Sequence, residues 1–118
     1  MNTRRVHDLM RQKFPPIEHA RREWVVVADS GKIESLMTEY LRSAEALVEV
    51  HRKLSALLPI GEAASFAATH IGEGEIRIAN RDFSGFVVVA QNGVATGWRM
   101  LDNRSLLRTA SPPAELAR

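Results

Sequence analysis

The longest regular pattern of hydrophobic positions in this chain runs from Lys32 to Leu58. Its members recur at spacings of four and three residues, which places them along one side of a helix. They are Ile33, Met37, Tyr40, Ala44, Leu47, His51, Leu54 and Leu58. At 1.5 Å per residue such a helix is about 40 Å long. The pattern therefore predicts one long central helix that packs lengthwise against another element.

The segment before this pattern predicts shorter elements. Residues 3–13 have helical spacing, and Phe14-Pro15-Pro16 ends that helix because a proline disfavours the helical conformation of the residue before it. Residues 17–28 allow two interpretations. Their apolar spacing favours a helix from about Pro16 to Val27, whereas the composition of Trp24–Ala28 is that of a short edge strand. Asp29 or Ser30 then caps the next helix.

After Leu58 the pattern changes from helical to alternating. Pro59-Ile60-Gly61 ends the long helix, and Glu62–His70 predicts a second, shorter one. Residues 75–79 alternate polar and apolar side chains, as a half-buried strand does. Segments 86–91 and 94–101 flank Asn92-Gly93, a strong signal for a two-residue hairpin turn. That turn sets Val87 opposite Trp98.

These elements define an α+β fold, with helices in the first 70 residues followed by a small antiparallel sheet. The length of 118 residues suits a single domain, which we place at residues 1–110. Segment 102–109 adds a helical turn, and residues 111–118, with two prolines, form a flexible tail. The sequence has no cysteine, no signal peptide at its start and no apolar run long enough to cross a bilayer. It predicts a soluble cytoplasmic protein.

Charge leaves a nucleic-acid partner open without favouring it. The net charge is only +2, but basic residues are concentrated near the N-terminus. A nucleic-acid-binding regulator is therefore the first alternative function, and its contacts are Arg4, Arg5, Arg11, Arg21 and Arg22.

The sequence carries no motif for catalysis, for a cofactor or for a metal ion. The four histidines do not pair at helical metal-ligand spacing, and no phosphate-binding loop or nucleophile elbow occurs. We therefore predict no enzyme, no cofactor and no metal. A small-molecule-binding module or enzyme, with its site between helix and sheet, is the second alternative.

The leading hypothesis is function by protein–protein contact. The apolar surface of the predicted long helix is wider than one small sheet can cover, which favours self-association as a homodimer. Trp98 is a further apolar anchor. The predicted contact residues are Tyr40, Leu47, His51, Leu54 and Trp98.

The layout also resembles that of the small bacterial quorum-sensing antiactivators. The resemblance lies in the short cysteine-free chain, the Lys32–Leu58 helix, the hairpin around Asn92-Gly93 and the lack of a catalytic motif. Proteins of that group occupy the dimerisation or DNA-binding surface of a transcription factor. The resemblance thus implies a dimeric antagonist that sequesters a transcription factor.

Overall fold

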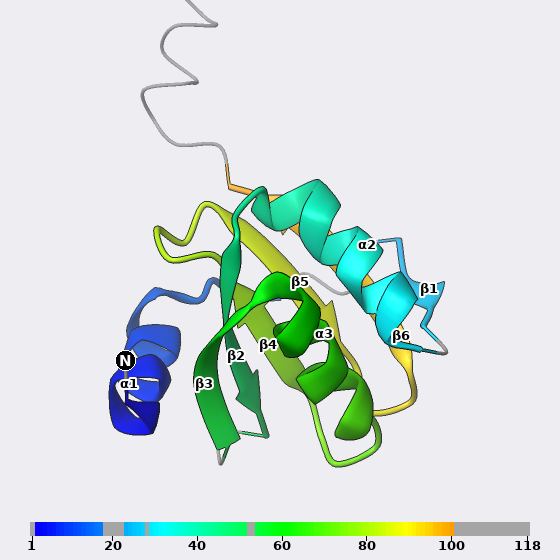
Figure 1. Ribbon diagram of the computed structural model, residues 1–118, viewed down its shortest axis with the longest axis horizontal. Helices are drawn as coiled ribbons and strands as arrows, with labels where there is room; N and C mark the ends of the chain where they lie inside the picture. Colours follow the sequence, from blue (N-terminus) through cyan, green and yellow to red (C-terminus); the bar gives the residue numbers. More distant parts are fainter. Residues whose placement is uncertain (1, 18–22, 28, 52–53, 101–118) are drawn as a thin grey trace, which may run out of the picture.

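The computed structural model describes residues 2–17, 23–27, 29–51 and 54–100, and it confirms an α+β fold (Figure 1). Six strands form one antiparallel sheet in the order β1-β6-β5-β4-β2-β3. The elements in chain order are α1 (Thr3–Lys13), β1 (Val25–Val26), α2 (Ser30–Leu41), β2 (Glu45–Val50), β3 (Leu54–Pro59), α3 (Ile60–Thr69), β4 (Ile76–Ala79), β5 (Gly85–Val89) and β6 (Val94–Arg99).

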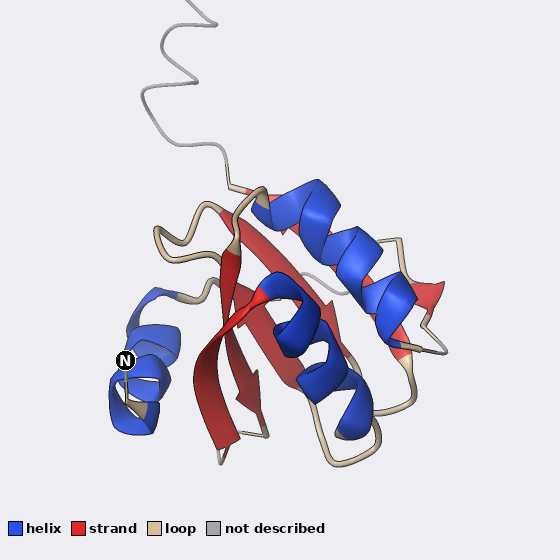
Figure 2. Cartoon of the chain, viewed as in Figure 1, coloured by secondary structure: helices blue, strands red, loops and turns tan. Residues whose placement is uncertain are grey.

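Helices cover both faces of the sheet (Figure 2). Helices α2 and α3 pack side by side on one face, over a core that includes Ile33, Met37 and Val48. Helix α1 packs on the other face against β2 and β3, over a core that includes Val6, Met10 and Leu47. Strand β2 is therefore buried on both sides, in the middle layer of the molecule.

The prediction of one long helix from Lys32 to Leu58 is wrong. Helix α2 ends at Leu41, and the segment after Arg42 folds back as the hairpin of β2 and β3. Because β2 is buried on both faces, apolar side chains occupy four of its six positions, three of them in a row, and such a run satisfies helical spacing as readily as strand spacing. The start of the helix is as expected, since the Asp29 carboxylate accepts a hydrogen bond from the Lys32 amide (3.1 Å).

The N-terminal predictions are confirmed in part. Helix α1 has the expected bounds, its first turn is capped by the Asn2 side chain, and it ends where Phe14 turns extended before Pro15. In segment 17–28 the edge-strand interpretation holds at Val25–Val26, and the preferred helix up to Val27 is wrong over that part. Residues 18–22 lie outside the described part of the chain.

The C-terminal half follows the predicted order of one helix and three strands. Helix α3 begins at Ile60, two residues before the predicted start, and β4 matches the alternating segment. The hairpin register differs by one residue, because the loop has three residues instead of two. The Ala90 amide donates to Val94 O (2.8 Å), and the Gly93 amide donates to Ala90 O (3.0 Å).

This register decides which face Trp98 occupies. Gly93 adopts a left-handed φ of 87°, as the last residue of a three-residue hairpin loop does. Phe86, not Val87, then lies opposite Trp98. Both rings pack with Phe14 on the α1 face, at centroid distances of 5.1 and 6.1 Å from it. The predicted helical turn at 102–109, the domain boundary at 110 and the tail at 111–118 lie outside the described residues.

Candidate functional site

The five predicted contact residues do not share a surface, and the helix face expected to hold four of them (all but Trp98) does not exist. Leu47 is buried beneath α1, and Trp98 is nearly buried in the aromatic cluster on the same face. Tyr40 lies on the opposite face, at the end of α2. His51 is in the turn after β2, with a left-handed φ of 51°. Of the five, Leu54 alone keeps a largely exposed apolar side chain, on β3.

The basic residues of the nucleic-acid alternative are only partly described. Arg4, Arg5 and Arg11 are exposed on α1. Arg21 and Arg22 fall outside the described residues. The structure thus leaves this alternative as a prediction.

The geometry draws attention to the two edges of the sheet. At one edge β1 is two residues long, whereas β3 at the other edge has six residues, Leu54–Pro59. Among the described strands, β3 is paired on one side only, with β2. None of its six residues is charged. Natural edge strands are usually protected by charges, a bulge or a short length, so a long uncharged edge indicates a place where another strand pairs.

The hydrogen bonds around β2 show which backbone groups of β3 face outward. The Ile60 amide donates to Ala44 O (3.0 Å), and the His51 amide donates to Glu75 O (2.9 Å). Bonded and non-bonded residue pairs alternate in an antiparallel ladder. The even-numbered residues of β3 therefore bond β2. Ser55, Leu57 and Pro59 point their backbone groups away from the sheet.

One outward carbonyl already has a partner. The Thr3 hydroxyl at the start of α1 donates to Ser55 O (3.1 Å), and the Ser55 hydroxyl donates to Thr3 O (2.8 Å). Pro59 carries no amide hydrogen. The Pro59 carbonyl, at the N-cap of α3, serves as the first acceptor of that helix. In the described part of the chain, the groups left for a partner are therefore the Ser55 and Leu57 amides and the Leu57 carbonyl.

Apolar surface continues beside this edge. Leu54 is 44% exposed. Toward the other end of β3, a shallow groove of about 640 Å³ runs between β3 and α3, with Leu58 and Phe66 among its lining residues. Sequence reasoning missed this surface because it placed residues 54–58 in a helix. The signal available was the absence of any charge from Leu54 to Gly61.

Polar groups gather at the C-terminal end of β2, beside Ser55. Glu49 is only 3% exposed, and its carboxylate accepts a hydrogen bond from His7 Nδ1 (2.6 Å) on α1. The Arg77 guanidinium bonds Glu75 (2.9 Å) and lies over the Phe14 ring. These groups attach α1 to the sheet. No cluster of three or more metal-ligating acids and histidines occurs among the described residues.

Comparisons with known protein families, with curated proteins and with solved structures gave no match. The resemblance to quorum-sensing antiactivators therefore stays a prediction. Of the helices the structure describes, none has the length and apolar character needed to cross a membrane.

Proposed function

We propose that the protein is a regulatory protein that acts by protein–protein contact, and that it forms a homodimer through the open edge of β3. The observation that carries the proposal is the six-residue, uncharged edge strand with outward backbone groups. The finer prediction, a cytoplasmic antagonist of a transcription factor, rests on the resemblance alone.

The outward groups of β3 match a second copy of the same strand. An antiparallel pair is related by a twofold axis, as in most homodimers. With the axis at Leu57, the Leu57 amide of each copy donates to the Leu57 carbonyl of the other. Ser55 then lies opposite Pro59, whose carbonyl is the first acceptor of α3, so the two Leu57 hydrogen bonds carry the pairing. Pro59 returns no hydrogen bond, but the Ser55 carbonyl that would need one already accepts from Thr3.

Side-chain chemistry is compatible with the same register. On the α3 face, Ala56 lies opposite Leu58 of the second copy, and Leu54 lies opposite its Ile60. On the α1 face, Leu57 lies opposite Leu57. None of the paired β3 residues is charged, so the strand pairing itself carries no desolvation cost of an ion. Apolar cross-strand pairs of this kind stabilise a sheet by about 0.2–1 kcal/mol each.

A matched pair of variants tests the proposal. Leu54→Lys places a charge on β3, and Val25→Lys places one on the opposite edge, at a residue of nearly equal exposure (44% and 47%). Sedimentation velocity from about 1 µM to about 1 mM, the range of weak to moderate affinity, should show a dimer for the wild type and for Val25→Lys. Leu54→Lys should shift the midpoint of dimerisation to higher concentration.

Two outcomes would contradict the proposal. The first is a wild-type protein that stays monomeric at the highest concentration. The second is a dimer that Val25→Lys weakens as much as Leu54→Lys. Thermal unfolding of both variants serves as the folding control.

A further inference from the structure

The last turn of α2 is bound by side chains from three parts of the chain. Its last three carbonyls each accept one side-chain hydrogen bond. Glu39 O accepts from Arg42 Nε (3.3 Å), and Tyr40 O accepts from Arg99 Nη1 (2.7 Å). Leu41 O accepts from Asn80 Nδ2 (2.9 Å). Cations and amide donors at a helix C-terminus satisfy carbonyls that have no partner within the helix.

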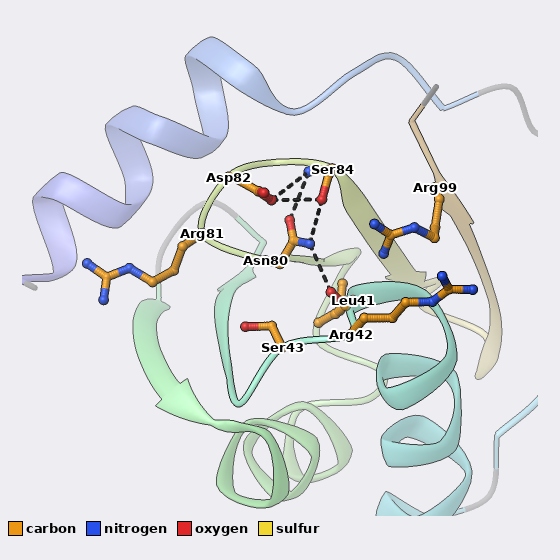
Figure 3. A pocket seen from close by; sticks show the side chains of 8 residues that line it. All are labelled: Leu41, Arg42, Ser43, Asn80, Arg81, Asp82, Ser84 and Arg99. Atoms are coloured by element: carbon orange, nitrogen blue, oxygen red, sulfur yellow. Dashed lines mark hydrogen bonds between the residues drawn. The ribbon is translucent and has the colours of Figure 1, made fainter. Parts of the chain in front are cut away.

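These residues border a polar hollow of about 310 Å³ (Figure 3). Three arginines (Arg42, Arg81 and Arg99) line it, against a single carboxylate, Asp82. Figure 3 shows the Arg42 and Arg99 guanidinium groups on the same side of Asn80, whereas Arg81 lies on the opposite side and points away. Among the described residues, no carboxylate oxygen lies within 4.0 Å of Arg42 or Arg99. Two adjacent positive charges therefore share one side of the hollow without an acidic partner.

The floor of the hollow is held firmly. Asn80 is buried, and its Oδ1 accepts hydrogen bonds from the Ser84 (2.9 Å) and Gly85 (3.2 Å) amides. Gly85 lies directly against the Tyr40 carbonyl, where a Cβ atom would overlap it. The loop between β4 and β5 is thus fixed on the end of α2, and the arginines project from a preorganised frame.

Arg42 has a backbone conformation that is unfavourable for arginine. It follows the last residue of α2 with φ 50° and ψ 47°, the left-handed conformation that favours glycine or asparagine at a helix end. Glycine at residue 42 would end the helix more readily. The sequence places a guanidinium there instead, beside that of Arg99.

We propose that Arg42 and Arg99 form a binding site for a phosphate monoester. Each guanidinium carries five N–H donors and uses one on the helix, so the others are available. A phosphate monoester has up to two negative charges and several acceptor oxygens, which matches two guanidinium groups bound to neighbouring carbonyls at the end of α2. A carboxylate is satisfied by one arginine fork. The two full charges outweigh the partial negative charge of the helix end.

The test uses inorganic phosphate and glycerol 3-phosphate as probes, with acetate at equal ionic strength as the carboxylate control. Backbone amide NMR shifts of the 80–85 loop and of Arg42 and Arg99 report binding. The wild type should show saturable shifts with both phosphates and none with acetate. Arg42→Gly should weaken binding at least about tenfold, the loss expected from one charge-assisted hydrogen bond.

Stability measurements separate a binding role from a structural one. Because glycine suits the left-handed position, Arg42→Gly should unfold at or above the wild-type temperature while binding is lost. Arg42→Asn is the second variant of this kind, and it should behave in the same way. Arg81→Gln is the matched control, since that side chain points away, and it should bind phosphate as the wild type does.

Three results would overturn the site. They are shifts that do not saturate, equal losses for Arg42→Gly and Arg81→Gln, and acetate binding as tight as phosphate binding. The dimer proposed above does not enter this test. The experiments can therefore contradict the proposed dimer and the proposed phosphate site independently of each other.

Discussion

A charge swap at Leu57 tests the dimer register directly. In the proposed pairing Leu57 is the one residue of β3 that lies opposite its own copy. Leu57→Lys places two ammonium groups against each other across the twofold axis, and Leu57→Glu places two carboxylates there. Neither variant should dimerise well alone. A mixture of the two should form a heterodimer, because it sets lysine opposite glutamate.

The expected effect has two parts. Bonded antiparallel pairs have Cα atoms about 5.5 Å apart, so flexible side-chain charges lie about 7 Å apart. At an effective dielectric constant of 20–80, their repulsion is about 0.6–2.4 kcal/mol. Loss of the leucine contact adds about 1 kcal/mol, since Leu57 is already half-buried against α1. Together these weaken the homodimer by about 10- to 300-fold.

Fluorescence-detected sedimentation of one labelled variant, titrated with the other unlabelled variant, measures the heterodimer. The matched control is the mixture of Leu54→Lys and Leu54→Glu. Leu54 lies opposite Ile60 of the second copy, so this mixture gains no ion pair. The reasoning is refuted if the Leu57 mixture stays monomeric, or if the Leu54 mixture associates as strongly. Circular dichroism of each variant shows whether α1 still packs on the half-buried position.

Two further predictions concern the monomer. Burial, together with the neighbouring Glu39 carboxylate, raises the pKa of Tyr40 above its ordinary value of 10.0. The folded state then holds the phenol proton more tightly than the unfolded state. Urea unfolding should therefore show that the stability of the wild type falls above pH 10 and that the stability of Tyr40→Phe falls less. Parallel pH curves for the two proteins would contradict this. His7→Ala leaves the buried Glu49 carboxylate without its hydrogen-bond donor and should lower the free energy of unfolding by about 1–3 kcal/mol. The control Glu73→Ala breaks the exposed His70–Glu73 pair and should lower the free energy of unfolding by less than about 0.5 kcal/mol. Equal losses for His7→Ala and Glu73→Ala would contradict this prediction.

Local signals predicted the elements whose ends are set by neighbouring residues. The Asp29 cap, the Phe14-Pro15-Pro16 stop and the alternation in β4 each act within a few positions, and each is confirmed. The helix prediction for residues 42–58 is wrong because β2 is buried on both faces, so its hydrophobic positions do not show the two-residue repeat that distinguishes a strand from a helix. The predicted hairpin register is wrong for a different, local reason. Asn92-Gly93 marks a turn in either a two-residue or a three-residue loop, and the bond from the Ala90 amide to Val94 O decides between them.

The candidate site depended on the same assignment. As a helix, residues 47–58 offered one apolar stripe that needed a partner. As a hairpin, they divide, so that Leu47 turns to the α1 core and Leu58 to the groove beside α3. What then needs a partner is the backbone of β3, which a helix would have satisfied internally. The unpaired amides and carbonyl of β3, more than apolar side chains, therefore favour association. Those groups, unlike a hydrophobic stripe, fix both the direction and the register of whatever strand binds.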